Sequence, residues 1–478
     1  MPEIKEECGI FGIYGDPEAV EKTYFGLHSL QHRGQESAGI ASSDGDSVQC
    51  HTGMGQVARV FRKDNGVLER LRNPFAIGHV RYSTTGSSTL ANAQPFMCEF
   101  SHGPVALAHN GNLINAALFR DEYEAHGAIF KTTNDTEIII HLLAKPSHQN
   151  KPDPLGHVLS HLQGAYSLLF LFPDRLEAAR DPYGFRPLCI GRTEKGAWVV
   201  ASETCAFDAI GAAYLRDVAP GEIVTLDRRG MRSRFFVPPG TVKPAHCVFE
   251  HVYFAKQSSM VFGENVHLSR IRCGRQLAIE HPVEADVVIP VPDSGTSAAI
   301  GYSRESGIPF DMGFVRSHYV GRTFLSPSQS LRDLGVKMKL TLIREVIRDK
   351  RVIVIDDSIV RGTTTKGKVH SLREAGAREV HLRIACPPII SPCFYGVDFP
   401  TKEELIASSR TVEEIRRYLQ VDSLGYISLP GLLSCMSLPP DHYCTACWSE
   451  KYPVPVTTMI GKFMMERHQK LLFNSVES

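Results

Sequence analysis

Two patterns of apolar and polar positions divide this chain of 478 residues into two parts. Before about residue 240, short apolar runs such as GIFGIYG from Gly9 and SLLFLF from Ser167 are separated by turn residues, which predicts strands and hairpins. Helical spacing occurs in a few stretches, including EAVEKTYFGLHSL from Glu18 and DTEIIIHLLAK from Asp135. Residues 237–245, VPPGTVKPA, hold three prolines and a glycine, so this segment is the predicted linker.

After the linker, the pattern changes to alternating strands and helices. ADVVIPVP, RVIVIDD and EVHLRIA are apolar strand runs, and a helix-compatible run with Gly376 at its end separates the last two, which predicts a right-handed βαβ unit. TKEE from Thr401 and TVEE from Thr411 are capping boxes that start two short helices. We expect a mainly parallel sheet flanked by helices, with ligands at the carboxyl ends of its strands.

The composition is that of a globular protein and excludes several classes of function. Hydrophobic residues make up 43% and charged residues 22%, and Lys+Arg equal Asp+Glu at 52 each, so no net field attracts nucleic acid or an anionic membrane. No run reaches the ~20 apolar residues of a membrane helix, and MPEIKEE is no secretory signal. We therefore expect a cytoplasmic protein whose twelve cysteines are reduced, catalytic or metal-binding.

The segment VIVIDDSIVRGTTTKGK, residues 352–368, predicts a phosphate site. Two adjacent carboxylates, Asp356 and Asp357, end a buried strand, and a loop rich in hydroxyls leads into a helix. Free N–H groups and the helix dipole favour phosphate there, while the carboxylate pair suits Mg²⁺ or sugar hydroxyls. Residues 362–368 also fit the start of a P-loop, but Val369 replaces the Ser or Thr that holds Mg²⁺. We interpret the segment as a site for a phosphorylated sugar or nucleotide.

This segment closely resembles the phosphoribosyl-pyrophosphate (PRPP) loop of type I phosphoribosyltransferases. The resemblance implies that Asp356 and Asp357 contact the ribose hydroxyls and Mg²⁺, and that the turn cradles the 5-phosphate. VPDSGTSAAIG from Val291 resembles the pyrophosphate loop, with Asp293 as a contact and Ser294 as a candidate Mg²⁺ ligand; a plain turn is the alternative. HYVGRTF from His318 resembles the loop that closes over PRPP. The implied residues of the turn are Ser358, Arg361, Gly362, Thr363, Thr364 and Thr365.

A second set of polar segments surrounds Cys8. Taken alone, a cysteine at the start of a strand is interpreted as a small buried hydrophobic residue. However, LQHRGQESAGI (30–40), GHVRYSTTG (78–86), AHNGNL (108–113) and TNDTE (133–137) place polar groups beside small residues. Together with Cys8, these segments resemble the glutaminase domain of N-terminal-nucleophile amidotransferases.

That resemblance implies a mechanism. The Cys8 thiol attacks the glutamine carboxamide, and its α-amino group, with an unperturbed pKa near ~8, is the base. Because the base exists only if Cys8 is the first residue, we expect residues 1–7, MPEIKEE, to be a propeptide removed after Glu7.

The same resemblance implies roles for five other residues. The Asn110 side chain and the Gly111 N–H form the oxyanion hole, Arg81 binds the glutamine α-carboxylate, and Asp135 holds its α-ammonium. Arg33 lies near the glutamine pocket, with a structural salt bridge as the alternative. His32, His79 and His109, which flank these motifs, are interpreted as structural.

The combination resembles the glutamine phosphoribosylpyrophosphate amidotransferase family over essentially the whole chain. It implies a propeptide (1–7), an α+β N-terminal-nucleophile glutaminase with an αββα sandwich (8–240), and an α/β type I phosphoribosyltransferase domain with a mainly parallel sheet (241–478). The implied reaction turns glutamine, PRPP and water into 5-phosphoribosylamine, glutamate and pyrophosphate, the committing step of de novo purine synthesis. Ammonia passes internally from the Cys8 site to the PRPP site.

The resemblance also implies partners and leaves two alternatives open. Purine nucleotides are expected as feedback inhibitors and the assembly as a homotetramer, with no nucleic acid or membrane partner. One alternative is a glutaminase with another acceptor, as in glucosamine-phosphate synthase or asparagine synthetase. The other is a catalytically silent regulator that senses PRPP.

Two segments depart from the family pattern. YFAKQSS (253–259) stands where family members usually carry a YFARPDS-like segment, so the cation remains as Lys256 but the Pro-Asp pair is lost. The usual KNR before YVGRTF is here Arg316, Ser317 and His318, so Arg316 takes the place of a lysine that contacts PRPP. We expect these departures to affect the contacts with PRPP and the inhibition by nucleotides, and to leave the reaction class unchanged.

Four cysteines match a metal-cluster pattern. Cys444 and Cys447 form a C-x-x-C, which by itself fits a metal half-site or a redox pair. In cluster-bearing family members a [4Fe–4S] centre takes one cysteine after the linker, one in a PCFYG segment and this terminal pair, which here are Cys247, Cys393, Cys444 and Cys447. Thiolate quartets also bind Zn²⁺, and spacing does not separate the two. Cys386 and Cys435 lie in apolar runs and are expected in the core.

Overall fold

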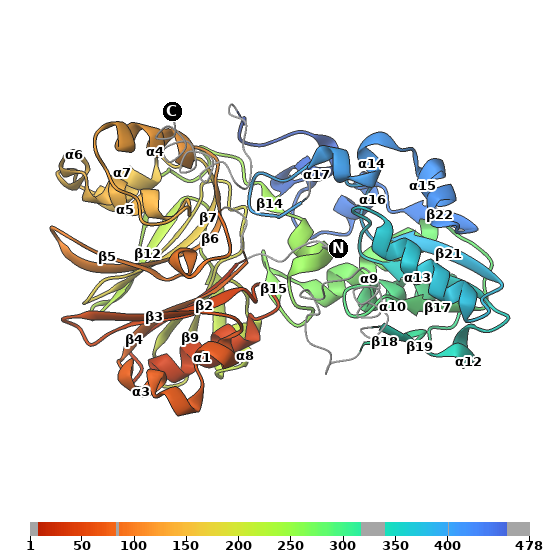
Figure 1. The fold of residues 1–478 in the computed structure, drawn as a ribbon, viewed down its shortest axis with the longest axis horizontal. Helices are drawn as coiled ribbons and strands as arrows, with labels where there is room; N and C mark the ends of the chain where they lie inside the picture. The colour runs from red at the N-terminus through yellow and green to blue at the C-terminus, as the bar shows by residue number, and fades with distance from the viewer. Residues whose placement is uncertain (1–7, 83–85, 317–339, 400, 457–478) are drawn as a thin grey trace, which may run out of the picture.

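A computed structural model describes residues 8–82, 86–316, 340–399 and 401–456 (Figure 1). Several predictions from the sequence fall on other residues. The propeptide (1–7), the segment HYVGRTF from His318, and Ser317 all lie outside the described residues.

The first part of the chain forms two antiparallel sheets. The seven-stranded sheet has the order β11-β9-β10-β1-β4-β2-β3, and the six-stranded sheet the order β13-β12-β8-β7-β6-β5. The strands of the first are β1 (Gly9–Tyr14), β2 (Ser37–Ser43), β3 (Val48–Met54), β4 (Phe75–Arg81), β9 (Cys189–Thr193), β10 (Trp198–Ala201) and β11 (Ala212–Asp217). Those of the second are β5 (Phe96–Phe100), β6 (Gly103–Leu113), β7 (Gly164–Leu171), β8 (Leu176–Arg180), β12 (Glu222–Asp227) and β13 (Gly230–Phe235).

The two sheets pack face to face between two layers of helices. Ile10 and Ile77 of the first sheet share one buried cluster with Leu169 and Leu176 of the second. Gly12 lies where the sheets approach closely, since a Cβ there would stand 2.9 Å from a Leu176 methyl carbon. Figure 1 shows helices on both outer sides, which gives the αββα sandwich predicted from the sequence. They are α1 (Ala19–Ser29), α2 (Val57–Val60), α3 (Val67–Arg70) and α8 (Cys205–Asp208) on one side, and α4 (Ala116–Ala125), α5 (Glu137–Ala144), α6 (Pro146–Gln149) and α7 (Pro154–Leu159) on the other.

The second part contains a four-stranded parallel sheet, as predicted. Its order is β17-β20-β21-β22, and every pair is parallel. Its strands are β17 (Val287–Pro290), β20 (Arg351–Asp356), β21 (Glu379–Ile384) and β22 (Ser423–Tyr426). The helices around it include α9 (Val266–Glu280), α10 (Thr296–Ser306), α12 (Arg344–Ile347), α13 (Thr363–Glu374), α14 (Ile406–Ser409), α15 (Val412–Leu419), α16 (Leu429–Ser434) and α17 (Ala446–Ser449).

Both predicted capping boxes form. Thr411 and Glu414 cap α15, whereas Thr401 and Glu404 cap a single 3₁₀ turn, Lys402–Glu404, that precedes α14. Short strands also pair outside the main sheets: β14 (His246–Cys247) with β23 (Tyr443–Cys444), β15 (Met260–Val261) with β16 (Glu264–Asn265), and β18 (Phe314–Arg316) with β19 (Leu340–Leu342).

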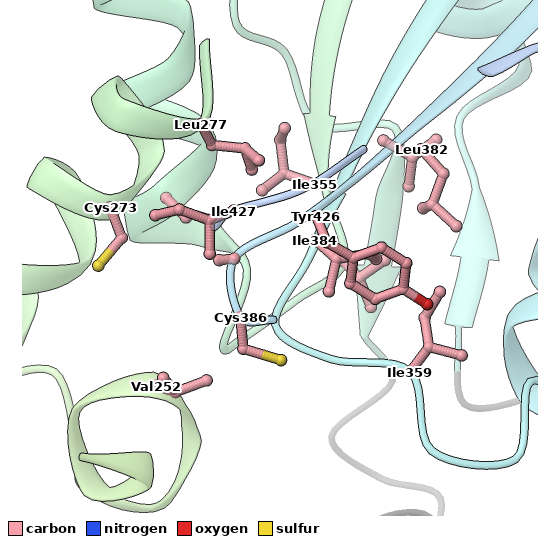
Figure 2. Close-up of a cluster of buried hydrophobic side chains, with 14 of the residues drawn as sticks. Val252, Cys273, Leu277, Ile355, Ile359, Leu382, Ile384, Cys386, Tyr426 and Ile427 are labelled. Carbon is pink, nitrogen blue, oxygen red and sulfur yellow. The ribbon is translucent and has the colours of Figure 1, made fainter. Parts of the chain in front are cut away.

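Apolar side chains from strands and helices fill the core of the second part. Figure 2 shows Leu277 of α9 next to Ile355 of β20, and Ile384 of β21 belongs to the same buried cluster. Cys386 lies in the same cluster, and it and Cys435 are buried, as predicted for core cysteines. This packing fixes the carboxyl end of β20, where the predicted phosphate site begins.

In the part of the chain that the structure describes, no helix is both long enough and apolar enough to cross a membrane.

Candidate functional site

Cys8 lies directly before β1, the strand between β10 and β4 in the seven-stranded sheet. Its side chain is buried, and its Sγ donates to the Tyr82 carbonyl oxygen over 3.3 Å. Burial raises the pKa of the Cys8 thiol to about 11, against the opposing effect of the Arg81 guanidinium. The thiol is therefore neutral near pH 7, and it needs a base to become a nucleophile.

A cation and an anion flank Cys8. Arg81 ends β4 and Asp135 lies just before α5; both are buried, and both act on the charge of the Cys8 thiol. Asp135 accepts a hydrogen bond from the Leu113 N–H at 2.8 Å. Although burial raises the pKa of Asp135, His109 and this N–H hold it below its ordinary value. A fixed positive and a fixed negative group beside a nucleophile suit the two charges of an α-amino acid.

Asn110 and Gly111 lie next to each other on β6. The Asn110 amide donates to the Ser202 hydroxyl at 3.4 Å, and that hydroxyl accepts from the Ile10 N–H at 3.0 Å, so Asn110 is tied to the strand that follows Cys8. Gly111 has φ +150°, and a Cβ there would stand 2.0 Å from the Ala165 carbonyl oxygen. Only glycine fits that position on β6.

Arg33 contacts the backbone of Cys8 and two buried carboxylates. Its Nε donates to the Cys8 carbonyl oxygen at 3.1 Å, while its terminal nitrogens lie 2.5 Å from Glu203 and 2.7 Å from Glu250. These contacts match the structural salt bridge that the sequence left as the alternative to a glutamine contact. Glu203 and Glu250 were not singled out from the sequence, because isolated acidic residues far apart in the chain form no motif.

The flanking histidines make contacts of a structural kind. His79 is buried, its Nε2 donates to the His109 carbonyl oxygen at 3.0 Å, and burial lowers its pKa to about 3. His32 lies 2.8 Å from a Glu203 oxygen. His109 lies 3.7 Å from the Asp135 carboxylate. Each ring thus supports a neighbouring group.

The second constellation lies at the carboxyl end of β20. Asp357 accepts hydrogen bonds from the hydroxyls of Ser294 and Ser358, and Asp356 lies 2.9 Å from the Lys368 ammonium. Burial and then the Asp356 charge raise the pKa of Asp357 to about 6. Two buried carboxylates side by side repel each other, and a divalent cation between them relieves that repulsion.

The loop after these carboxylates opens a helix. Gly362, with φ +76°, precedes α13, whose first residues are Thr363, Thr364 and the buried Thr365. The free N–H groups of this helix start therefore point toward the loop, as an anion site requires. Arg361 lies 2.8 Å from Glu404 at the edge of the loop.

The turn after β17 meets the same edge of the sheet. A Cβ on Gly295 would stand 2.5 Å from the Ile355 carbonyl oxygen, so this turn and β20 approach closely. Arg316 pairs with Asp293 at 2.6 Å, and the Gln257 amide donates to the Asp293 carbonyl oxygen at 2.8 Å. The structure thus brings the carboxylates, the two turns and Arg316 to one edge of the parallel sheet.

Two cations of this site were missed by the sequence analysis as functional groups. Lys368 was noted only as the end of a motif, and its pairing with Asp356 depends on which face of α13 turns to β20. Arg270 of α9 is buried; burial lowers its pKa to about 10, while the Asp357 charge opposes that shift.

The four predicted cysteine ligands gather at one place. Cys247 and Cys444 are paired residues of the parallel strands β14 and β23. Burial and then the charges of Cys444, Cys247 and Cys393 raise the pKa of Cys447 well above its ordinary value, so the four thiols act on one another. The Tyr395 N–H donates to Cys393 Sγ at 3.3 Å, which is the kind of support that ligating thiolates receive.

Comparisons with known proteins agree with this arrangement. Residues 79–209 match a sequence family described as a glutamine amidotransferase domain. The chain is 52% identical over 451 residues to an "Amidophosphoribosyltransferase, chloroplastic" of Glycine max, covering 94% of this chain and 79% of the relative. It is 48% identical over 464 residues to the amidophosphoribosyltransferase of Bacillus subtilis (strain 168), covering 95% and 96%. A solved structure of glutamine PRPP amidotransferase from B. subtilis, complexed with ADP and GMP, superposes with a TM-score of 0.89 at 47% identity, covering 95% of this chain and 99% of that one.

Proposed function

The chain belongs to the amidophosphoribosyltransferase family, and from that membership we propose how its two sites divide the reaction. The enzyme is a phosphoribosyltransferase with glutamine amidotransferase activity, and it turns glutamine, PRPP and water into 5-phosphoribosylamine, glutamate and pyrophosphate, the committing step of de novo purine synthesis. The observation that carries the division is that one chain holds both constellations: Cys8 between a cation and an anion, and a carboxylate pair at a strand–loop–helix anion site.

The proposed domains follow the sheets. The antiparallel sheets end at Phe235 and the parallel sheet begins at Val287, which supports a glutaminase domain over 8–240 and a phosphoribosyltransferase domain with the cysteine segment over 241–478. Residues 1–7 are the proposed propeptide.

At the glutamine site, Arg81 and Asp135 bind the α-carboxylate and α-ammonium of glutamine. The Cys8 thiol gives its proton to the α-amino group that removal of residues 1–7 exposes, and its sulfur attacks the carboxamide carbon. The Asn110 amide and the Gly111 N–H stabilise the oxyanion, and the α-ammonium group returns its proton to the departing nitrogen, which leaves as ammonia. Water then hydrolyses the thioester to glutamate and the free Cys8 thiol. Arg33 acts here as a positioning residue, because it holds the Cys8 carbonyl rather than a group of the substrate.

At the second site, Thr363, Thr364 and Thr365, with Ser358, Arg361 and Gly362 of the same loop, hold the 5-phosphate of PRPP at the start of α13. Asp356 and Asp357 accept hydrogen bonds from the ribose hydroxyls, while Asp293 and Arg316 lie at the pyrophosphate end. The donors present fit Mg²⁺, since Ser294, Asp356 and Asp357 offer the hard oxygen ligands it prefers. When bound, Mg²⁺ neutralises the charge of the pyrophosphate leaving group. Ammonia attacks carbon 1 of PRPP, and the bond to pyrophosphate breaks.

Direct contacts between the two parts support internal passage of ammonia. The Asn112 amide donates to the Phe394 carbonyl oxygen at 2.9 Å, and Arg186 donates to the Tyr395 carbonyl oxygen at 2.6 Å. Gly396 lies close to Gly111 of the proposed oxyanion hole, since a Cβ on Gly396 would stand 3.3 Å from the Gly111 Cα. The segment 394–396 is thus a proposed lining of the route from the Cys8 site.

Cys247, Cys393, Cys444 and Cys447 fit a [4Fe–4S] cluster better than a single Zn²⁺. A tetrahedral Zn²⁺ with Zn–S bonds of about 2.3 Å holds its sulfurs ~3.8 Å apart. In the described part of the chain, no three of these four sulfurs lie within 4.8 Å of one another. The thiols are electrostatically coupled and yet more widely spread, which suits a multi-iron cluster. Its proposed role is to hold β23 and α17 against β14.

Regulation and location are also proposals. The solved B. subtilis relative is described with ADP and GMP, which supports purine nucleotides as inhibitors of this enzyme. A homotetramer stays a prediction. The relatives from Glycine max and Arabidopsis thaliana are named chloroplastic, so family membership does not fix a compartment, and a cytoplasmic location stays a prediction.

The test is glutamate release from glutamine by anaerobic protein with Mg²⁺, with and without PRPP. Strong stimulation by PRPP with matching pyrophosphate release is the expected result. Glutamate release at the same rate with and without PRPP would mean that ammonia is transferred to another acceptor. Absence of release from protein that begins at Cys8 and holds its iron would favour the silent regulator.

A further inference from the structure

Three histidine side chains lie close together on or beside helices α6 and α7. These helices cover the outer face of the six-stranded sheet (Figure 1). His148 belongs to α6, His157 to α7, and His161 follows one helical turn later. The ring centroids of His157 lie 5.0 Å from those of His148 and 4.6 Å from those of His161, and the remaining pair is 5.9 Å apart. Neither the glutamine site nor the PRPP site uses them.

Backbone carbonyls fix two of these rings in the form that binds a metal ion. Nδ1 of His148 lies 3.0 Å from the Leu142 carbonyl oxygen, and Nδ1 of His161 lies 2.7 Å from the His157 carbonyl oxygen. Because a carbonyl oxygen only accepts, each Nδ1 carries the hydrogen, which leaves the lone pair of the neutral ring on Nε2. Metal-ligating histidines are oriented in this way, by a hydrogen bond from the nitrogen that does not touch the metal.

The surroundings of His148 and His157 favour the neutral form of these two rings. Partial burial lowers the pKa of His148, and the charges of Lys145, His161 and Lys151 lower it further. The pKa of His157 is also lowered, first by burial and then by the charges of His161, His148 and Lys151. A neutral imidazole is the form that coordinates a metal ion, and three imidazole side chains at one place form a ligand set that selects transition metals over Mg²⁺ or Ca²⁺.

We propose that His148, His157 and His161 form a site for one divalent transition-metal ion of the class that prefers imidazole, such as Zn²⁺, Co²⁺ or Ni²⁺. Their three nitrogens do not all lie within 4.8 Å of one another, so a side chain has to turn for the ion to be held. The His157 ring is the one free to do so, because it forms no hydrogen bond within the described part of the chain and is only half-buried.

A second group, His32, Glu203 and Cys205, has ligand atoms that all lie within 4.8 Å of one another, but it is a poorer metal site. Both Glu203 oxygens already accept hydrogen bonds, one from Arg33 and the other from Ser259 at 2.7 Å. A cation there would have to displace the Arg33 guanidinium from a buried carboxylate and would leave that guanidinium without the contact. The three-histidine group has no such competitor among the contacts that the described residues make.

The test is a Co²⁺ titration of untagged, cluster-bearing protein under anaerobic conditions, with excess Mg²⁺ to occupy the carboxylate site. Co²⁺ gives visible bands with imidazole ligands and an additional near-ultraviolet charge-transfer band with thiolates. We expect wild-type protein to bind one Co²⁺ without the thiolate band, and His157→Gln or His161→Gln to weaken that binding by about tenfold or more, since loss of a supporting hydrogen bond alone costs about as much.

The matched control is His126→Gln. His126 is exposed and its Nδ1 lies 2.7 Å from the Glu122 carbonyl oxygen, so it shares the tautomer but not the cluster. Its loss is expected to leave Co²⁺ binding unchanged. Equal Co²⁺ affinity in wild type, His157→Gln and His161→Gln, or binding that shows only the thiolate band, would overturn the proposal.

Discussion

The Ser294 hydroxyl donates a hydrogen bond to the Asp357 carboxylate, although 63 positions separate the two residues in the sequence. Ser294 follows β17 and Asp357 follows β20, and these strands are parallel neighbours. Because the carboxyl ends of neighbouring parallel strands meet at one edge, this bond joins the proposed pyrophosphate turn to the proposed ribose site. This hydrogen bond within the protein thus holds the turn after β17 and the turn after β20 in place.

The first prediction concerns Asp357 and pH. An unfolded aspartate has a pKa near ~3.9 and the folded group one of about 6. The folded state therefore binds this proton more tightly, and the stability it contributes is present below about pH 4 and lost as the pH rises through 6. At about 1.4 kcal/mol per pKa unit, the loss of folding stability between these two pKa values is ~3 kcal/mol. Asp357→Asn cannot ionise and should not show this loss. In Mg²⁺-free buffer, the melting temperature of the variant relative to that of wild type should rise from pH 4 to 7.

The same variant should bind PRPP more weakly, because the ribose and Mg²⁺ lose a ligand. Asp64→Asn, at an exposed surface carboxylate, is the control and should track wild type at every pH. An unfolding difference between wild type and Asp357→Asn that stays constant with pH would show that the Asp357 pKa is not raised.

Asn110 is predicted to act only at the glutamine site. Removal of one oxyanion donor costs about 10²–10³ in kcat, so Asn110→Ala should slow glutamine hydrolysis by that factor while synthesis from added ammonia continues. The two rates, measured on one preparation with PRPP present, separate the sites. If ammonia-dependent synthesis falls equally, the side chain acts through folding or the ammonia route instead.

Arg33 is predicted to stabilise the fold more than an exposed arginine does. Its side chain is fully buried between Glu203 and Glu250, so Arg33→Met removes the guanidinium that both buried carboxylates share and should cost about 3–5 kcal/mol. Arg62 pairs with Asp64 at the surface, where a pair contributes about 0–1 kcal/mol, and Arg62→Met is the matched control. Melting temperatures of the two variants check this, and similar values would contradict the assignment.

Whether a structural feature could be predicted from the sequence depends on whether the residues that form it are close together in the chain. The strand–loop–helix at Asp356 and the cap at Thr411 were predictable, since strand, turn and capping signals lie within a few residues. The pairs Arg33–Glu250 and Asp356–Lys368 were not predicted. Arg33 and Glu250 meet only because the residues after β14 return to the start of β1, where Arg33 contacts Cys8, and a single sequence carries no record of that contact.

Thr401 shows the same limit on a smaller scale. Its capping box with Glu404 forms as predicted, yet the turn it starts is a 3₁₀ helix of three residues. Capping signals specify where a helix begins, whereas its length is set by packing, here by Leu405 and Ile406, which turn into the core.

Processing of the first seven residues is predicted to control the glutamine site. Because burial raises the pKa of the Cys8 thiol to about 11, the thiol needs a base close by, and a free α-amino group at residue 8 is the proposed one. Intact mass should show active protein beginning at Cys8. Fully active protein that retains Met1 to Glu7 would contradict this, whereas ammonia-dependent synthesis should be indifferent to processing.

The last prediction separates the cysteine quartet from the other thiols. Cys393→Ser removes one proposed ligand, so anaerobic protein should lose iron, acid-labile sulfide and the broad visible absorbance together. Cys98→Ser, at a half-buried thiol on β5 far along the chain from the quartet, is the control and should retain all three. Trp448 lies directly after Cys447, so its fluorescence, measured in a Trp198→Phe background, should rise when the cluster is lost. Iron content at the wild-type level in Cys393→Ser would remove Cys393 from the ligand set, and zinc in place of iron and sulfide in wild-type protein would replace the cluster by a single ion.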